Sequence, residues 1–335
     1  MKVVITGGAG FLGLRLAKRL LARGVLTAPD GHQEKIDELT LFDLDPPAGN
    51  LSGNGITVKS VRGEISDDAA VQALIDRDDI SVFHLASVVS GGGELDFDRA
   101  MRVNLDGGRS LLEALRTRAG CPRLVFASSI AVFGGAAMPT VVGDYAKRTP
   151  QTTYGVTKAV GELLVNEYSR KGFFDGRSAR LPTVIIRPGK PNAAASSFAS
   201  GVFREPLNGV DFSLPVPWDT VMPVLGYRAI VDGLVHLHEL DGQWLGDDRA
   251  LSLPSLTVTA RQMIEALKRV AGGRALGAVK EQPDPFITGI CKTWPRDSDY
   301  ARAKQLNFPR EQSLDEIVQY YIEDYLDTGD QQDRP

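Results

Sequence analysis

The chain has 335 residues, 43% of them hydrophobic and 24% charged, which provides enough apolar sequence for a sizeable core. Its 38 basic and 42 acidic residues give a formal net charge of −4 without any Lys/Arg-rich block, so we expect no nucleic-acid partner. The two cysteines, Cys121 and Cys291, lie outside any CxxC spacing, which argues against a disulfide framework or a zinc site and fits a reducing cytoplasm.

The N-terminal segment KVVITGGAGFLG, residues 2–13, predicts a strand, a glycine-rich turn and a helix. The β-branched residues 3–5 suit a buried strand, and apolar residues recur at helical spacing over residues 11–21. Gly7 permits a tight turn, Gly10 lets backbone approach a pyrophosphate, and Gly13 lets the helix pack closely on the sheet. Such glycines also occur in ordinary loops, but the strand before them and the helix after them favour a dinucleotide site.

The second predicted strand, residues 39–43, ends in Asp43. In a dinucleotide site this acid accepts hydrogen bonds from the adenosine ribose and repels a 2′-phosphate, which favours NAD over NADP. Its distance from Gly13 exceeds the usual spacing of about 20 residues, and we attribute the excess to a polar insertion at residues 30–38. Asp45 is the other candidate, and an acid in a turn before two prolines is the alternative interpretation.

Short apolar segments then alternate with helical ones along the first half of the chain. We predict strands at residues 56–61, 81–85 and 124–127, a helix at 67–76 capped by Asp67, and a long helix at 95–118 that carries Asn104. No hairpin signal separates the strands, so the fold class is α/β, with a Rossmann-type doubly wound parallel sheet over residues 1–180. His84 lies inside a predicted strand, and we interpret it as a packed core residue rather than a base.

Residues 124–143 carry no formal charge, which raises the question of a membrane span. Paired serines, paired glycines and Pro139 favour a buried strand followed by an active-site loop. The apolar run at the N-terminus stops at glycines, too soon for a signal peptide. We therefore expect a cytoplasmic protein with no membrane partner.

Candidate catalytic residues follow the fifth strand. Ser128 and Ser129 stand at its carboxyl end, where ligands bind in open α/β sheets. Tyr154 and Lys158 open a helix expected to run to about residue 171, and their spacing puts them on one face. A nearby ammonium and the positive nicotinamide of an oxidised cofactor lower the tyrosine pKa from about 10, so that Tyr154 can take a proton from a substrate alcohol. A chance surface pair is the alternative.

Several pieces of the chain match the pattern of one enzyme family. They are GGAGFLG, the strand-end Asp43, GEISD, FHLAS, RVNLDG, VFASSIAVFG, YGVTK and IIRPG. On these pieces the chain resembles the extended short-chain dehydrogenases/reductases, often labelled NAD-dependent epimerase/dehydratase, over nearly its whole length.

The resemblance implies roles for individual residues. Tyr154 would be the catalytic base, and Lys158 would lower its pKa and hold the nicotinamide ribose. Ser129 would orient the substrate hydroxyl and Asn104 would support the site. The residues implied to contact NAD are Gly7, Gly10, Phe11, Leu12, Gly13, Asp43, Glu64, Ile65, Leu85, Ala86, Ser87, Tyr154, Lys158 and Pro188.

Departures from the family pattern reduce the number of activities to consider. Ile130 and Ala131 follow Ser129 where dehydratases carry an acidic pair, so nothing there can protonate a leaving hydroxyl. Residues 222–232, MPVLGYRAIVD, lack the Arg-Asp-Phe-like segment that nucleotide-sugar members place on a diphosphate. Phe133 stands where the family often has tyrosine, and Glu64 where it commonly has aspartate.

Residues 187–192, RPGKPN, and the following AAASSFASGVF suggest a compact site for a short polyhydroxy acid, with Arg187 or Lys190 on its carboxylate. A connecting loop with solvated charges is the alternative. With HLASVVSGGGE, residues 84–94, this segment resembles a subgroup that oxidises the 2-hydroxyl of the four-carbon sugar acid D-erythronate with NAD, giving 2-oxo-tetronate. The substrate residues so implied are Ser87, Ser129, Tyr154, Arg187 and Lys190. A nucleotide-sugar 4-epimerase and a cofactor-sensing protein without turnover are the alternatives.

Beyond residue 181 the regular alternation breaks down. Proline-rich stretches separate helices predicted at residues 227–240, 260–270 and 314–325, which we assign to a smaller α/β substrate-binding lobe over residues 181–327. Residues 328–335 are polar and expected to be frayed. His236 and His238 are two apart and face different ways on a helix, so we expect no metal. The resemblance implies a homodimer through the helices that carry Asn104 and Tyr154.

Overall fold

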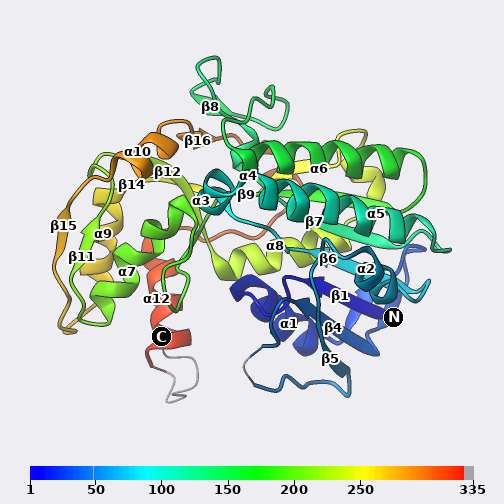
Figure 1. Cartoon of the computed structure of the whole chain (residues 1–335). Helices are drawn as coiled ribbons and strands as arrows, with labels where there is room; N and C mark the ends of the chain where they lie inside the picture. Colours follow the sequence, from blue (N-terminus) through cyan, green and yellow to red (C-terminus); the bar gives the residue numbers. More distant parts are fainter. Residues whose placement is uncertain (48, 328–335) are drawn as a thin grey trace.

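The computed structural model describes residues 1–47 and 49–327, so the tail predicted at residues 328–335 lies outside the described residues (Figure 1). Its largest element is a seven-stranded sheet whose neighbouring strands are all parallel. In order across the sheet, the strands are β13 (Ala250–Ser252), β9 (Asp175–Leu181), β7 (Arg123–Ser129), β6 (Ile80–His84), β1 (Lys2–Thr6), β4 (Glu38–Asp43) and β5 (Thr57–Arg62). The predicted doubly wound sheet is confirmed, and its strand order reverses between β1 and β6, where a ligand crevice opens.

Helices cover both faces of this sheet (Figure 1). On one face lie α1 (Phe11–Arg23) and α8 (Tyr227–Glu239), and on the other α2 (Asp68–Leu74), α5 (Gly107–Arg116) and α6 (Thr153–Arg170). Along β1, Val3 and Ile5 join the first core and Val4 the second, all three fully buried. Burying each such side chain contributes about 1.5–3 kcal/mol, so both faces fix the position from which the glycine-rich turn leaves β1.

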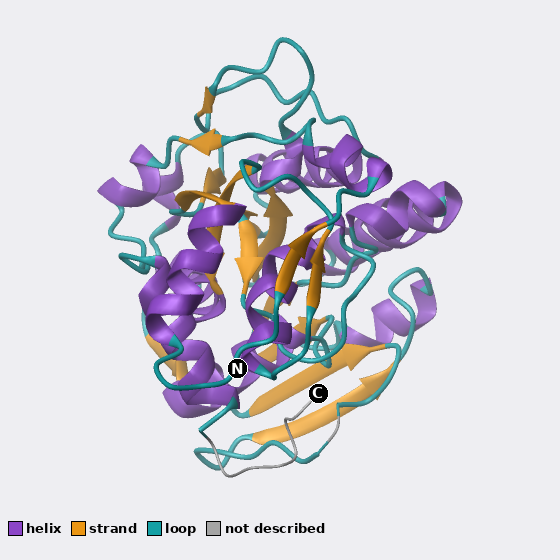
Figure 2. Ribbon diagram, turned by 90° about the vertical axis from the view of Figure 1, so that its left-hand side faces the viewer, coloured by secondary structure: helices purple, strands orange, loops and turns teal. Residues whose placement is uncertain are grey.

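A third core holds the smaller lobe, which occupies the left of Figure 1 and faces the viewer in Figure 2. Its strands are β10 (Thr183–Ile185), β12 (Val221–Gly226) and β14 (Leu256–Thr259) in one sheet, and β11 (Phe212–Leu214) and β15 (Val279–Glu281) in another. Its helices are α7 (Phe198–Leu207), α9 (Ala260–Val270), α10 (Pro285–Cys291) and α12 (Leu314–Tyr325).

Two elements from the second half of the chain pack with the large sheet instead of the smaller lobe. Strand β13 extends the sheet beside β9, and α8 buries Ile230, Leu234 and Leu237 in the core that contains β1. The packing of α8 differs from the predicted place of residues 227–240 in the smaller lobe, because helical spacing alone shows an apolar stripe without its partner. The domain boundaries themselves remain a prediction.

A hairpin that we did not predict spans residues 25–35 and includes the first part of the polar insertion. Strands β2 (Val25–Thr27) and β3 (Gln33–Lys35) pair antiparallel as a hairpin. Gly31 in its turn has a φ of +91°, and Asp30-Gly31 was the signal available in the sequence. Glu239 on α8 accepts a hydrogen bond from the Thr27 backbone at 3.0 Å and so ties the hairpin to the core.

The long helix predicted at residues 95–118 is interrupted. It consists of α3 (Ser90–Leu95), α4 (Phe97–Ala100), a π-helical turn η1 (Met101–Asp106) and α5. The side chain of Asp96 accepts from the Arg99 N–H and caps α4, which is why the chain restarts there. The π turn contains Asn104, and such turns are frequent at functional sites.

The uncharged stretch at residues 124–143 forms β7, a 3-10 turn η2 (Ile130–Val132), a loop and β8 (Val141–Val142). Strand β8 pairs with β16 (Asp297–Ser298), which precedes α11 (Ala301–Gln305). Two further 3-10 turns are η3 (Ala195–Ser197) and η4 (Gly242–Leu245). Over the described residues, every helix is too short or too polar to cross a lipid bilayer.

Candidate active site

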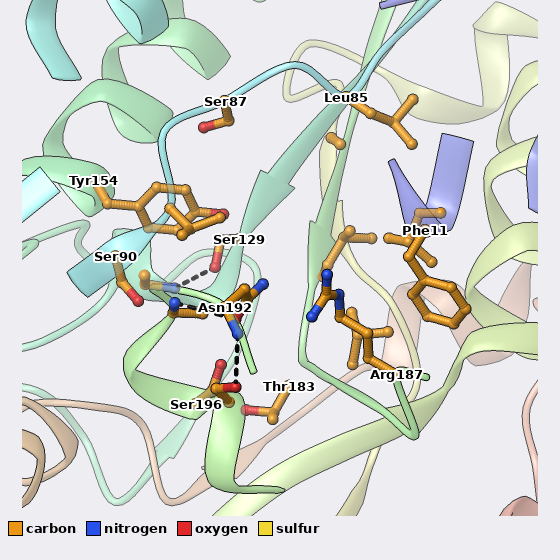
Figure 3. A pocket seen from close by; sticks show the side chains of 18 of the residues that line it. Phe11, Leu85, Ser87, Ser90, Ser129, Tyr154, Thr183, Arg187, Asn192 and Ser196 are labelled. Atoms are coloured by element: carbon orange, nitrogen blue, oxygen red, sulfur yellow. Dashed lines mark hydrogen bonds between the residues drawn. The ribbon is translucent and has the colours of Figure 1, made fainter. Parts of the chain in front are cut away.

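A cavity of about 320 Å³ opens at the carboxyl ends of β1, β6 and β7, against residues that enter the smaller lobe (Figure 3). It brings together eleven residues predicted from the sequence for the cofactor, the substrate or the catalytic step. They are Gly7, Gly10, Phe11, Leu12, Gly13, Leu85, Ser87, Ser129, Tyr154, Lys158 and Arg187. The glycine-rich turn therefore lines the same cavity as Ser129, Tyr154 and Lys158.

The glycine-rich turn forms a cradle that side chains would fill. Gly7 has a φ of +72°, and a Cβ on it would lie 2.8 Å from the Ala86 nitrogen. A Cβ on Gly13 would lie 2.2 Å from the Gly7 carbonyl oxygen, so α1 can approach the turn only at glycine. Gly10 precedes α1 and offers no side-chain cap, which leaves the first helical N–H groups available to a phosphate. These residues fit the pyrophosphate of a dinucleotide.

Asp43 ends β4 beside this turn. Its carboxylate accepts hydrogen bonds from the Ala9 backbone at 2.9 Å and from the Leu44 backbone at 2.8 Å. The two bonds hold the acid next to the glycines, as a ribose-binding role requires. Asp45, the other candidate, is 82% exposed and pairs with Arg62.

Tyr154 lies in the first turn of α6, which Thr152 caps through the Gly155 N–H at 3.0 Å. A Cβ on Gly155 would lie 2.2 Å from the Ala131 carbonyl, so this glycine lets α6 start close to the end of β7. Ser129, at that strand end, lines the same cavity as Tyr154, and its hydroxyl accepts from the Ala131 N–H at 3.1 Å. Figure 3 shows both side chains beside the cavity.

The ionisation of Tyr154 differs from our prediction. We expected Lys158 to lower the pKa of this phenol, whereas burial raises it above the ordinary value and the neighbouring Ser129 hydroxyl only opposes that rise. The physical reason is that the buried phenolate loses its hydration, and no protein group fully replaces it.

Lys158 is buried beneath the cavity. Its ammonium donates to the Ala127 carbonyl at 2.8 Å and lies 5.5 Å from the centre of the Tyr154 ring. Burial lowers the pKa of Lys158 to about 7, and the carboxylate of Glu162 opposes this shift. The ammonium therefore depends on nearby negative charge to stay protonated at neutral pH.

His84 is the core residue that we predicted. It is 2% exposed, and its Nδ1 shares a 2.6 Å hydrogen bond with the Thr6 hydroxyl. Burial lowers the pKa of His84 to about 3, with the Lys158 charge adding to the effect. A neutral, fully packed imidazole results.

Other predicted residues stand outside the cavity lining. Glu64 and Lys190 are exposed, Ile65 is packed in the core, Pro188 is half-buried, and Ala86 adjoins Gly7 behind the turn. Asn104 is buried and bonds the backbone of the loop that carries Ser87, so it touches the site through that loop. Of the two cations predicted for a substrate carboxylate, Arg187 lines the cavity and Lys190 does not.

The cavity also contains residues that sequence reasoning did not single out. Ser90, Thr183, Asn192, Ser196, Ser200, Arg204 and Trp294 are among them. Asn192, Ser196 and Ser200 lie in the segment at residues 187–203 that is predicted to form the substrate site, whereas Arg204 and Trp294 carry no local signal. Arg204 is 1% exposed and donates to the Arg187 carbonyl at 3.0 Å. Burial and the Arg204 charge lower the pKa of Arg187 below its ordinary value.

Comparisons with known proteins agree with the architecture. The family model described as "NAD dependent epimerase/dehydratase family" matches residues 3–221. The chain is 50% identical to a D-erythronate dehydrogenase of Cupriavidus necator, over 97% of this chain and 98% of that protein. It is 39% identical to a D-erythronate dehydrogenase of Haemophilus influenzae, over 96% and 99%.

A solved structure, described as the nucleoside-diphosphate-sugar epimerase from Agrobacterium tumefaciens, superposes with a TM-score of 0.88. It is 41% identical, over 97% of this chain and 94% of that one. The predictions of the family, its fold and its NAD cofactor are confirmed by these matches. The chain belongs to the NAD-dependent epimerase/dehydratase family of extended short-chain dehydrogenases/reductases.

Proposed function

We propose that this protein oxidises the 2-hydroxyl of a short sugar acid with NAD, converting D-erythronate to 2-oxo-tetronate. The single observation that carries the reaction type is the meeting of Ser129, Tyr154 and Lys158 with the glycine cradle in one cavity. Two full-length relatives named D-erythronate dehydrogenase support the choice of acid. NAD supplies the hydride acceptor when it is bound.

The protein's own residues orient the substrate hydroxyl and accept its proton. Ser129 holds the 2-hydroxyl against the Tyr154 phenol, beside which it lines the cavity. Tyr154 removes the hydroxyl proton while the hydride leaves the second carbon, so a C–H and an O–H bond break and a C=O bond forms. Lys158, which is 3% exposed, contributes a positive charge that favours the phenolate.

Arg187 is the residue that we propose for the substrate carboxylate. Its backbone N–H donates to Ser200 and one guanidinium nitrogen donates to the Lys190 carbonyl at 2.6 Å. Across the described residues no carboxylate pairs with its guanidinium. A half-buried cation without a counter-charge attracts an anionic group, and a charge-assisted bond satisfies it.

The test is direct. The protein is incubated with NAD and D-erythronate, and reduced cofactor is followed by absorbance, with other four- and five-carbon sugar acids and NADP in parallel. We expect NAD reduction with D-erythronate, and Tyr154→Phe should lower kcat by about 10²–10⁴-fold. Tyr145→Phe is the matched control, since that side chain is 81% exposed. Absence of reduction with every acid contradicts the proposal.

A nucleotide-sugar 4-epimerase is the second candidate, favoured by the description of the Agrobacterium structure. Such an enzyme returns the hydride to its substrate and shows no net reduction of cofactor. Turnover of a UDP-sugar without accumulation of NADH, together with inactivity on sugar acids, would favour it.

We also propose a homodimer in the cytoplasm. Val156 and Leu163 on the outer side of α6 are 40% and 53% exposed, which supports burial of this helix against a second copy. Light scattering of the wild type and of Leu163→Glu tests the assembly. The homodimer is contradicted if the wild type and the variant are both monomeric. Fractionation of cells tests the location.

A further inference from the structure

A buried network of charges lies one helical turn beyond Lys158. Glu162 is 0% exposed and follows Lys158 by four residues on α6, so the two side chains share a face. Its Oε1 accepts from the Ser128 hydroxyl at 2.6 Å and from Arg180 Nε at 2.9 Å. Its Oε2 accepts from Arg180 Nη2 and from Arg148 Nη1, both at 2.8 Å.

The same network holds the loop that follows the active-site strand. Arg180, also 0% exposed, donates to the Asp144 carbonyl at 3.0 Å. Asp144 Oδ1 accepts from the Ser252 backbone at 2.7 Å, and its Oδ2 lies 4.0 Å from Arg302. The network thus joins α6, β7, β9 and the loop at residues 133–150.

We infer that Glu162 is a positioning residue for the proposed proton transfer, which keeps the Lys158 ammonium charged and fixes the strand end that carries Ser129. This inference rests on the proposed function and extends it to a residue that touches neither substrate nor cofactor. Ser128, which donates to Glu162, immediately precedes Ser129, so this carboxylate holds the strand end that carries Ser129 and lies one helical turn from Lys158.

The charges around Lys158 decide whether loss of the Glu162 carboxylate raises or lowers the pKa of this lysine. On its own helix Lys158 faces Tyr154 and Glu162, on β6 it faces the neutral His84, and on β7 it meets the Ala127 carbonyl and the Phe126 ring. Arg180 and Arg148 lie behind Glu162, and Arg187 lines the cavity. Glu162 is therefore the negative charge that supports the ammonium within a predominantly positive surrounding.

Removing that carboxylate should leave Lys158 among uncompensated cations. In Glu162→Gln, the alkaline limb of the pH profile of kcat/KM, which reports loss of the Lys158 proton, should move down by about one pH unit. At one pH unit above the wild-type limb, kcat/KM of the variant should then be roughly tenfold lower than that of the wild type. Glu162→Asp keeps the charge and should restore the limb toward its wild-type position.

Arg148→Met provides a test with the opposite sign. Arg148 is 25% exposed and is one of two cations on Glu162, so its removal leaves the carboxylate paired with Arg180 and the site more negative. The alkaline limb should move up by about half a pH unit. Glu167→Gln, on the same helix but paired at the surface with Arg170, is the matched control and should leave the limb unchanged.

A readout without turnover separates this inference from the proposed function. Affinity for NADH, followed by protein fluorescence from pH 6 to 10, should weaken as Lys158 loses its proton, with the same order of midpoints: Glu162→Gln lowest, wild type between, and Arg148→Met highest. If the wild type reduces no NAD with any sugar acid, the proposed function fails while this series still reports on Lys158.

Two outcomes overturn the inference. The first is an unmoved limb and midpoint in both variants, relative to Glu167→Gln. The second is a shift of both variants in the same direction, which a merely structural role for the network would produce. Should Glu162→Gln fail to fold, Arg148→Met decides alone, since an upward shift supports the inference and an unshifted profile removes it.

Discussion

Asn104 exchanges two hydrogen bonds with the backbone of Val88. Its Oδ1 accepts from the Val88 N–H at 2.7 Å and its Nδ2 donates to the Val88 carbonyl at 3.0 Å. The same Nδ2 lies 3.2 Å from the Thr157 hydroxyl on α6. A side chain from the π-helical turn thereby fastens the loop that carries Ser87 to the helix that carries Tyr154 and Lys158.

Asn104→Ala should impair catalysis more than folding. The Val88 N–H and carbonyl would both lose their partner, which costs about 1–3 kcal/mol and frees the loop beside the cavity. We expect kcat/KM for D-erythronate to fall about 10–100-fold and the melting temperature to fall by a few degrees. Asn166→Ala is the control, because Asn166 on α6 binds the Arg249 backbone away from the cavity. Equal losses of activity in the two variants would contradict the prediction.

Arg187 and Lys190 are the two cations predicted for the substrate carboxylate, and one variant of each distinguishes between them. Arg187→Gln should raise KM for D-erythronate about 10–100-fold with a smaller change in kcat, because a charge-assisted bond of about 1.5–3 kcal/mol is lost. Lys190→Gln should behave as wild type, since Lys190 is exposed and outside the cavity lining. Steady-state kinetics on both variants decide between them, and a larger KM effect at Lys190 would reverse the assignment.

Cofactor choice should depend on Asp43. Asp43→Ser removes the carboxylate beside the glycine turn, so the ribose loses its acceptors and a 2′-phosphate is no longer repelled. The ratio of kcat/KM for NAD over NADP should fall at least about tenfold. Asp45→Ser, at the exposed acid two residues on, should leave the ratio intact. The opposite pattern would assign the role to Asp45.

His84 should destabilise the protein in acid. Its folded pKa of about 3 lies below the ordinary value of about 6.5, so between these values the unfolded chain binds a proton that the folded chain does not. Stability is retained above pH 6.5 and falls as the pH drops, by up to about 1.4 kcal/mol per pH unit from this residue. His238, whose pKa burial lowers to about 4, acts in the same direction.

Urea unfolding between pH 6.5 and pH 4.5 measures this dependence. His84→Asn, in which the amide can take the place of Nδ1 toward Thr6, should flatten the slope by about 1.4 kcal/mol per unit. His32→Asn is the control, because the His32 side chain is 58% exposed. An unchanged slope in His84→Asn would show that the folded protein accepts the proton at this site.

Local patterns predicted the parts of the molecule that short-range physics defines. The buried strand before Gly7, the capped helix after Asp67 and the amphipathic helices at residues 260–270 and 314–325 appear as expected. The hairpin at residues 25–35 and the π turn around Asn104 were not predicted. One extra residue in a helix, or a short turn between polar strands, alters the apolar period too little to be recognised.

The sheet, the cradle at Gly7 to Gly13 and the spacing that puts Tyr154 and Lys158 on one face could be predicted from the amino-acid sequence, because strand burial, glycine conformation and helical periodicity act between near neighbours. The position of Arg187 rather than Lys190 at the cavity, and the contact of Glu162 with Arg180, required the folded chain. It also reversed the expected direction of the Tyr154 pKa. These outcomes depend on which distant segments exclude water from a given side chain, and no local pattern encodes that exclusion.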